Sequence, residues 1–452
     1  MNSKTEYIKC ISAQKEKDMV PLELQNNPEY TAACIQREKH ANAVNRLKDQ
    51  KGKRNVLFFV INASCWKFDT VYQKMSRSKR YNPIILVCPQ CDRGEEYKTE
   101  QQQSCFEFFK ERGYNIINSF DAATGNYIDA RSLSPDIIFY TNPYEGLIDN
   151  RYYISNFSDV LTCYANYAFM NNDEKWSASL PLHKSVWKYF CEYDLTRHYN
   201  KVGTKLYYDN RVVVGYPMYD CFVDKRFVGS DWKQQGTSKK RLIYAPHHTI
   251  EKDGWIHYST FLTTGEIMAE LRDKYKDQVQ FVFKPHPLLK GKLYNTEGWG
   301  REKTDAYYES WANAENSSIV DNDYVDLFKS SDALIHDCGS FIVEYLYVQK
   351  PVMHLNTGQI KEELNAEAME AYQAHYLMNK TEDIKWFITE VVLNGKDTKR
   401  KTREAVYKKL LIPPHHRLVA DNILYEIDRE LSSGIRRRYF NLKEAICRAF
   451  KM

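Results

Sequence analysis

The sequence predicts an α/β protein with two Rossmann-like domains that face each other across a cleft, and with helical extensions at both ends. Three observations predict this class. The 452 residues are too many for one ordinary hydrophobic core. Short β-rich runs alternate with helical stretches from Arg54 onward, which is typical of parallel sheets covered by helices. A polar segment with linker chemistry, Gly229–Lys240, divides this alternation into two parts.

The first run of alternation follows a polar, helical lead-in (residues 1–50) and occupies residues 51–228, the N-terminal Rossmann-like domain. Its strands are predicted from short apolar runs rich in β-branched and aromatic residues. The expected strands are Asn55–Ile61, Asn82–Val87, Tyr114–Asn118, Asp136–Tyr140, Val160–Tyr164 and Arg211–Val214, and the expected helices are Ser64–Met75, Tyr97–Arg112 and a stretch near Leu182–Tyr193.

The second run begins after the linker (229–240) and occupies residues 241–415, the C-terminal Rossmann-like domain. Residues 416–452 are expected to form C-terminal helices with a basic amphipathic tail. The strands expected in this half are Leu242–Ala245, Val279–Lys284, Ser318–Val320, Ala333–Ile335 and Pro351–Leu355, and the helices are Thr260–Lys274, Tyr308–Ala314, Tyr324–Ser330 and Ser340–Val348, with helix from there to the end.

Composition excludes several classes of protein. The content is 43% apolar and 27% charged, which is ordinary for a globular chain. No apolar run reaches about 18 residues, and the polar N-terminus carries no apolar signal segment, so we expect a cytoplasmic protein. A net charge of +5 does not favour nucleic-acid binding. The 11 cysteines lack framework spacing, and Cys88 and Cys91 have no second metal-ligand pair, so reduced thiols are expected.

Three polar clusters follow predicted strands of the C-terminal domain, where parallel sheets bind ligands. The third cluster runs from His336 to Ser340 into a helix. Gly339 allows the turn, and free N–H groups near Ser340 would favour a phosphate or diphosphate. Glu344 is placed to accept hydrogen bonds from a vicinal diol such as ribose. The alternative is that Asp337 or Ser340 only caps the helix.

The other two clusters supply cations and imidazoles. Lys284 can offset phosphate charge, and His286, held between two prolines, can donate to a phosphate oxygen or transfer a proton. In the Ala245–Thr249 cluster, His247 and His248 cannot point the same way from an extended strand end, and we prefer His248 as the residue that faces the cleft. Thr249 is a further candidate for substrate binding.

Two other features allow more than one interpretation. Asp321-Asn322-Asp323 resembles a divalent-metal motif, but Asp323 is favoured as a helix cap, so we expect no metal and keep Asn322 as a substrate-binding candidate. The tail from Arg436 has Leu442, Ile446 and other apolar residues at helical spacing beside basic ones. It would lie on an anionic membrane surface or pack as an ordinary terminal helix.

Four motifs in order carry a family resemblance: Gly215-Tyr216-Pro217, Tyr244-Ala245-Pro246, Lys284-Pro285-His286-Pro287, and an aspartate–serine element that follows Ser331-Asp332, namely Asp337-Cys338-Gly339-Ser340. Together they resemble the CDP-glycerol glycerophosphotransferases, which include teichoic-acid-type polymerases. The resemblance implies a GT-B fold with an N-terminal acceptor domain and the nucleotide donor in the C-terminal domain. It implies that His286 is catalytic or stabilises phosphate, and that Asp337 and Ser340 bind the donor diphosphate.

One departure from the family pattern concerns the base. Members carry a His-Gly pair in the first domain, whereas none of the 12 histidines here precedes glycine, and Cys163–Tyr167 contains no histidine. His183 is the nearest substitute, so the catalytic candidates are His286, His248 and His183. The expected partners are a CDP-alditol donor, a glycan or lipid-linked glycan acceptor of capsule or teichoic-acid type, and the inner membrane face, with no cofactor and no nucleic acid.

Two alternatives to alditol-phosphate transfer remain open. Related GT-B enzymes move sugars from nucleotide-sugar donors, so a glycosyltransferase is the second interpretation. A non-catalytic binding subunit of a polysaccharide-assembly complex is the third, and the missing His-Gly pair is its only support.

Overall fold

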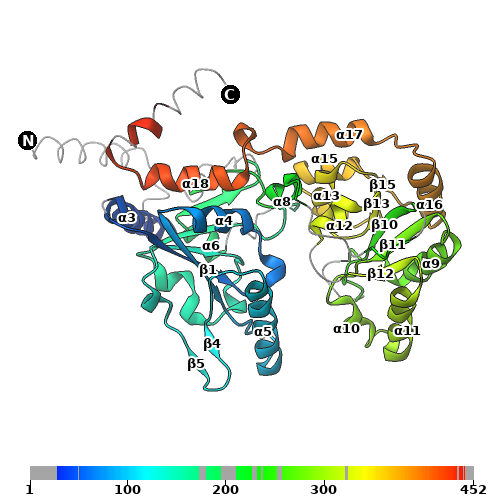
Figure 1. Cartoon of the computed structure of the whole chain (residues 1–452), viewed down its shortest axis with the longest axis horizontal. Helices are drawn as coiled ribbons and strands as arrows, with labels where there is room; N and C mark the ends of the chain where they lie inside the picture. The colour runs from blue at the N-terminus through cyan, green and yellow to red at the C-terminus, as the bar shows by residue number, and fades with distance from the viewer. Residues whose placement is uncertain are drawn as a thin grey trace, which may run out of the picture. The chain divides into compact units, whose positions relative to one another are not determined.

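The computed structural model describes residues 28–48, 50–172, 180–194, 210–226, 232–235, 238–251, 257–320, 324–434, 437–440 and 442 (Figure 1). The chain forms two compact units. The first comprises residues 1–167, 175–214 and 420–452, and the second comprises residues 168–174 and 215–419. Within the described residues, no helix has the length and apolar character that a membrane span requires.

The first unit is built on a seven-stranded parallel sheet with the order β3-β2-β1-β6-β7-β8-β9. Its strands are β1 (Arg54–Val60), β2 (Tyr81–Val87), β3 (Ile116–Asn118), β6 (Ile137–Tyr140), β7 (Leu161–Ala165), β8 (Lys188–Cys191) and β9 (Arg211–Val213). A small antiparallel pair, β4 (Phe120–Asp121) and β5 (Asn126–Tyr127), lies outside this sheet. Continuous apolar runs such as Val56–Val60 form strands here because both faces of a parallel sheet are covered.

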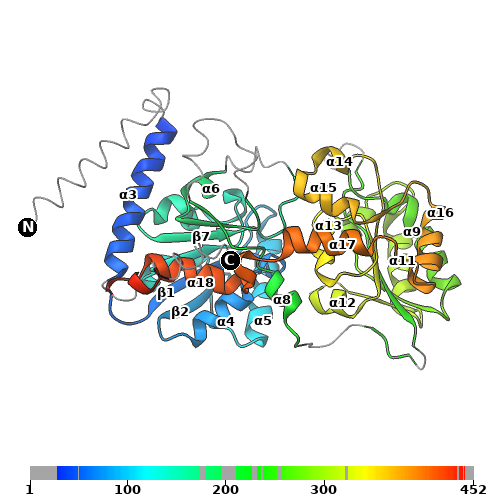
Figure 2. The ribbon, with the colours of Figure 1, turned by 90° about the horizontal axis from the view of Figure 1, so that it is seen from above.

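Helices cover the first sheet, and Figure 2 shows α3 along one side of this unit near α6 and β7. The helices are α3 (Pro28–Lys48), α4 (Asp69–Arg77), α5 (Glu95–Glu111), α6 (Pro181–Ser185) and α18 (Val419–Glu430). The last of these is a C-terminal element of the first unit. Lys74 on α4 pairs with Asp421 on α18 at 2.9 Å, and the Tyr81 hydroxyl donates to Asp428 at 2.6 Å.

The second unit has a six-stranded parallel sheet with the order β12-β11-β10-β13-β14-β15. The strands are β10 (Lys240–Ala245), β11 (Val279–Phe283), β12 (Ser317–Ile319), β13 (Ala333–His336), β14 (Val352–His354) and β15 (Tyr376–Leu377). Helices α9 (Phe261–Lys274) and α11 (Gly300–Asn313) pack an aromatic core against it, and Phe283 stacks on Trp311 with ring centroids 5.1 Å apart.

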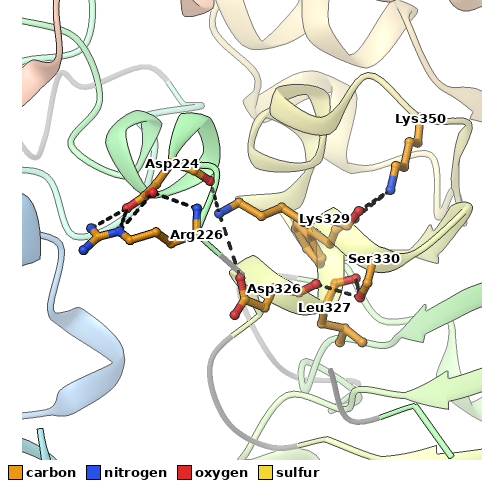
Figure 3. Close-up of polar contacts among 8 residues, drawn as sticks. Asp224, Arg226, Asp326, Leu327, Lys329, Ser330 and Lys350 are labelled. Atoms are coloured by element: carbon orange, nitrogen blue, oxygen red, sulfur yellow. Dashed lines mark hydrogen bonds and ion pairs between the residues drawn. The ribbon is translucent and has the colours of Figure 1, made fainter. Parts of the chain in front are cut away.

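Shorter helices complete the second unit. They are α8 (Tyr219–Val223), α10 (Leu289–Leu293), α12 (Val325–Ser330), α13 (Phe341–Glu344), α14 (Ile360–Glu363), α15 (Ala366–Gln373), α16 (Glu382–Trp386) and α17 (Arg400–Val406). Figure 3 shows how α12 is held at its C-terminal end: the Lys329 ammonium donates to the Asp224 carbonyl at 3.0 Å, and Lys350 donates to the Lys329 carbonyl at 2.5 Å.

The structure corrects two expectations about elements. Residues 182–193 do not form one helix, because α6 ends at Ser185 and the apolar run Lys188–Cys191 is strand β8, paired with β7 and β9. The chain after Leu355 is not wholly helical either, since Tyr376–Leu377 adds the edge strand β15. Both strands are short, and tertiary pairing outweighs their weak local pattern.

The boundaries of the units also differ from those expected. The chain passes into the second unit at Gly215, not near residue 229, and returns to the first unit at Ala420. The polar segment chosen as a linker packs on the second unit where it is described: Trp232 is buried and donates to Ser330 at 2.8 Å, and Lys233 donates to the Ala312 and Ala314 carbonyls. Most of the predicted amphipathic tail, residues 441 and 443–452, lies outside the described residues.

Candidate functional site

Three loops at the carboxyl edge of the second sheet form the candidate site. They follow β11, β10 and β13, which are neighbours in the sheet. The loops are joined by hydrogen bonds, since the His286 backbone N–H donates to the Pro246 carbonyl at 3.0 Å. The clusters that the sequence singled out therefore lie at one edge, as expected for parallel strands.

Asp337 joins the β13 loop to two other segments. Its side chain is fully buried, and its carboxylate accepts the His247 N–H at 2.5 Å, the Thr260 N–H at 2.6 Å and the Thr260 hydroxyl at 2.9 Å. Burial raises the pKa of Asp337 to about 6, while these donors oppose the rise. We expected Asp337 at a diphosphate; the structure instead places both of its oxygens on groups of the chain.

His247, His248 and His286 form a compact, half-buried cluster, which we call the loop histidine cluster. The ring centroids are 4.4 Å apart for His247 and His248, 4.1 Å for His248 and His286, and 5.1 Å for His247 and His286. The expectation that only one of His247 and His248 would face the site is wrong. The strand has ended at Ala245 and the backbone bends at His248, so the alternation of an extended chain no longer applies.

Hydrogen bonds orient two of these rings. His247 Nδ1 lies 3.0 Å from Thr249 Oγ1, which also accepts the Tyr258 N–H at 3.0 Å. His286 Nδ1 accepts the Leu288 N–H at 3.2 Å, so the neutral ring carries its proton on Nε2. His286 therefore presents an N–H donor, not a lone pair, at its outer nitrogen.

Burial and neighbouring positive groups keep the rings of His247 and His286 neutral. Burial lowers the pKa of His247 to about 2, helped by His248, His286 and Lys292. Burial also lowers the pKa of His286 to about 3, helped by His248, Lys292 and Lys284. Lys292 is paired with Glu251 at 2.5 Å, so the buried Lys284 ammonium and the Nε2–H of the neutral His286 ring are the groups here that suit an anion.

The loop histidine cluster has the spacing of a metal site, because one nitrogen from each ring lies within 4.8 Å of the others. Two observations favour an anion over a cation. His286 Nε2 carries a proton and cannot coordinate in that tautomer, and Lys284 and Lys292 act on the rings as positive charges. Phosphate oxygens suit such a site, since they accept from N–H groups and pair with ammonium groups.

Lys284 lies where the β11 and β13 loops meet. Its side chain is buried, its Nζ is 5.9 Å from the Tyr324 ring centroid, and its charge acts on both Cys338 and His286. A buried ammonium at this edge supplies the cation that the sequence predicted for the site.

Three residues of the β13 loop and the helix after it, Ser340, Gly339 and Glu344, have surroundings that differ from those expected of an anion site. Ser340 is half-buried and precedes α13. This helix has only four residues and continues as a 3₁₀ turn, so its dipole places little positive charge at Ser340. Gly339 lies against neighbours: a Cβ there would be 3.0 Å from Asn171 Nδ2 and 3.3 Å from the Tyr258 ring. Glu344, expected at a ribose diol, accepts the hydroxyls of Tyr216 and Tyr324, both at 2.6 Å.

Two candidates lie elsewhere. His183 belongs to the first unit, on α6, where it is buried and stacks on Tyr189 with ring centroids 4.8 Å apart. Asn322 lies outside the described residues. Sequence reasoning missed Thr260 and Tyr258, which contact Asp337 and Thr249, because single polar residues before a helix carry no signal in one sequence.

The part of the chain that carries this site matches the model of a known protein family. Residues 194–357 match the model for CDP-Glycerol:Poly(glycerophosphate) glycerophosphotransferase, and they include all three loops. The resemblance that the motifs indicated is confirmed over this part of the chain. A comparison with curated protein sequences finds no match.

Solved structures show the fold. A variant of the wall teichoic acid polymerase TagF is 12% identical, with a TM-score of 0.53, over 89% of this chain and 97% of that chain. A putative UDP-N-acetylglucosamine 2-epimerase from Listeria monocytogenes is 15% identical, with a TM-score of 0.51, over 85% and 98%. The S. aureus MnaA-UDP co-structure is 15% identical, with a TM-score of 0.50, over 84% and 97%. The predicted GT-B-type fold is thereby confirmed.

Proposed function

We propose that this protein transfers an alditol phosphate, such as glycerol phosphate, from a CDP-linked donor to a hydroxyl of a cell-surface glycan of capsule or teichoic-acid type. The observation that carries the proposal is that Lys284, whose charge acts on His286, lies with the loop histidine cluster at the strand edge matched by the glycerophosphotransferase model. That edge offers N–H donors and ammonium groups, which suit a diphosphate.

The proposed reaction is an in-line displacement at phosphorus. The acceptor hydroxyl oxygen forms a bond to the alditol-bearing phosphorus, and the bond from that phosphorus to the bridging oxygen breaks. CMP leaves with the electron pair, and the hydroxyl proton passes to a base. Charge therefore builds up on the departing phosphate, where Lys284 and His286 would stabilise it.

His286 acts in this proposal as a hydrogen-bond donor. Its Nδ1 is occupied by the Leu288 N–H, and its Nε2–H is available to a phosphate oxygen. Removal of the acceptor proton falls to another residue, and His248 and His183 remain the candidates proposed from the sequence. Ser340, Thr249 and His247 are proposed to bind the donor beside it, while Asp337 and Glu344 would hold the loops through the contacts described above.

No cofactor enters the proposal, because Lys284 and the imidazole N–H groups would supply the positive potential that the phosphates need. The acceptor is proposed to be a glycan or a lipid-linked glycan, reached by a protein that lies on the inner face of the membrane through its basic C-terminal segment. Arg437 and Arg438 belong to that segment.

A panel of donors tests the proposal. CDP-glycerol, CDP-ribitol, UDP-sugars and GDP-sugars are each added to the purified protein, and melting temperature and CMP or nucleoside diphosphate release are measured. We expect a CDP-alditol to raise the melting temperature and to release CMP when a glycan acceptor is present. Turnover of a nucleotide sugar would support the second candidate, a GT-B glycosyltransferase, instead. Donor binding without turnover would support a binding subunit.

A further inference from the structure

A cavity of about 330 Å³ lies in the first unit, whereas the three loops of the candidate site belong to the second. Four segments that are distant in sequence line it: α3, the chain from α6 into β8, the residue before β9, and the end of α18. Figure 2 shows two of these walls, α3 and α6, next to each other. The charged side chains that line the cavity are Arg37, Lys48, Lys184, Lys188 and Glu430.

This cavity lies at the edge of the first sheet where strands begin, so we call it the amino-edge cavity. Lys188 is the first residue of β8, Asn210 directly precedes β9, and the two strands are parallel. Ligands of α/β sheets ordinarily bind at the opposite, carboxyl edge. The amino-edge cavity therefore takes no part in the function proposed above, and the inference drawn from it does not rest on that function.

The charges around the amino-edge cavity are unbalanced. Four of its lining side chains are cationic, and Glu430 is the one acidic side chain among the described residues that line it. Glu430 Oε1 lies 3.4 Å from Lys188 Nζ and 3.5 Å from Arg429 Nη2, so one carboxylate is shared by two cations. Cations gathered around one space repel one another, and an anion in that space would offset the repulsion.

Hydrogen bonds hold the walls of the amino-edge cavity in place. The Gln36 amide on α3 lies 2.9 Å from His40 Nε2 and donates to the Ser158 carbonyl at 3.0 Å, which ties α3 to the chain before β7. The Asn210 amide donates to the His183 and Val186 carbonyls at 3.0 and 2.9 Å. A site whose walls are already fixed loses little entropy when a ligand binds.

The lining offers an apolar surface beside its cations. Trp187 is buried, and Lys188 Nζ lies 5.4 Å from the centroid of its ring. The volume of the cavity is about ten times the share of one water molecule in the liquid, so it exceeds the need of a single phosphate group. A ligand that combines an anionic group with a small carbon skeleton would use both the cations and the indole.

We propose that the amino-edge cavity binds a phosphate ester of a small polyol or sugar, with the phosphate held by the lining cations and the carbon skeleton near Trp187. A phosphate presents several acceptor oxygens in different directions, which suits cations that come from α3, α6 and β8. The planar fork of a guanidinium such as that of Arg37 binds two phosphate oxygens at once, whereas a lysine pairs as a point charge.

Binding of a soluble probe to the purified full-length protein tests the proposal. Glycerol 3-phosphate is titrated in a phosphate-free buffer and followed by calorimetry, with glycerol as the uncharged comparison. We expect the phosphate to bind and glycerol not to bind. The double variant R37Q/K184Q should weaken the affinity at least about tenfold, because two charged donors are lost. The control K51Q/K53Q removes two exposed cations that do not line the cavity, and it should bind like wild type.

Two further variants keep the test decisive. E430Q removes the opposing carboxylate and should tighten binding by about threefold to tenfold, an outcome that a damaged fold cannot produce. K284Q changes the loops of the second unit and should keep this binding event, which separates the amino-edge cavity from the candidate site. Loss of all binding in K284Q, with wild-type affinity in R37Q/K184Q, would overturn the proposal whether or not the protein transfers alditol phosphate.

A vesicle arm distinguishes a soluble phosphate ester from a lipid headgroup of the same chemistry. Wild type and R37Q/K184Q are sedimented with phosphatidylglycerol vesicles and with phosphatidylcholine vesicles. Binding to phosphatidylglycerol that the double variant loses, without binding of the soluble probe, would support the phosphate site and identify a lipid as its ligand. Absence of binding in both arms, or equal binding of wild type and R37Q/K184Q, would overturn the proposal and leave the cations as a solvated face.

Discussion

Asp337 holds the backbone of His247 in place, since its Oδ1 accepts the His247 N–H at 2.5 Å while its Oδ2 accepts from Thr260. One buried carboxylate thus joins the loop after β13 to the loop after β10 and to the start of α9. It acts beside the hydrogen bonds that join the same loops, from the His286 N–H to the Pro246 carbonyl and from Cys338 Sγ to the Ala245 carbonyl. The role assigned to Asp337 is therefore positioning, and it can be tested apart from ligand binding.

Asp337→Asn should destabilise the second unit. An amide has one accepting oxygen, so its NH₂ group would face the N–H of His247 or of Thr260, and one buried donor would lose its partner. We expect a loss of about 1–3 kcal/mol in the free energy of unfolding. Urea denaturation followed by circular dichroism measures it. Asp326→Asn, at a carboxylate paired with Lys329 at 3.9 Å near the surface, is the control and should change stability by less than about 0.5 kcal/mol.

His286 substitutions separate hydrogen-bond donation from proton transfer. Asn can still accept the Leu288 N–H but places no donor where Nε2 lies, whereas Gln can place an N–H near that position. We expect His286→Asn to lower kcat by about 10²–10³-fold, as for the loss of one charge-stabilising donor. We expect His286→Gln to retain about tenfold more activity than His286→Asn. CMP release from CDP-glycerol measures both; equal inactivity of Gln and Asn would indicate proton transfer by the ring instead.

Lys350→Met should weaken the end of α12. The Lys350 ammonium donates to the carbonyls of Phe328, Lys329 and Ser331, which are the last acceptors of that helix and of the turn before β13. Figure 3 shows the contact with Lys329. Burial lowers the pKa of Lys350, yet its three acceptors explain why a lysine is kept there. We expect a loss of about 1–3 kcal/mol in the free energy of unfolding, measured by urea denaturation. Lys408→Met, at an exposed lysine, should leave stability unchanged.

Much of the fold could be predicted from sequence because buried parallel strands have strong patterns. Runs such as Val56–Val60 and Val279–Phe283 are apolar throughout, and the structure makes both of them strands. The strand Lys188–Cys191 was missed because its four residues begin only two residues after the helical turn that ends at Ser185, and pairing with β7 and β9 selects the extended form.

The sequence predicted where the candidate site lies, but it did not predict the hydrogen-bond partners of the residues in it. Loops after neighbouring parallel strands must meet at one edge, so the meeting of His247 and His286 follows from topology. The partners of Asp337 and Glu344 could not be read from the sequence, because Thr260, Tyr216 and Tyr324 lie far along the chain and carry no motif.

Acid should destabilise the protein through histidines that the fold keeps neutral. The pKa of His247 is lowered to about 2 and that of His286 to about 3, against about 6.5 in an unfolded chain. Below pH 6.5 the unfolded state therefore binds more protons at these residues, and the free energy of unfolding falls as pH falls, by about 1.4 kcal/mol per pH unit for each histidine. Asp337 has the opposite effect, because its pKa is raised in the fold. Between about pH 6 and about pH 3.9, its pKa in an unfolded chain, the folded state binds up to one proton more at this residue than the unfolded state does.

A comparison of wild type with His286→Gln tests this prediction, because the Asp337 contribution is common to both proteins and cancels. The free energy of unfolding is measured by urea denaturation from pH 7.5 to pH 5, and its slope against pH should be smaller in the variant by the equivalent of about one bound proton. Parallel pH profiles for the two proteins would show that His286 is protonated in the fold, and the hydrogen-bond role proposed for its neutral ring would then be wrong.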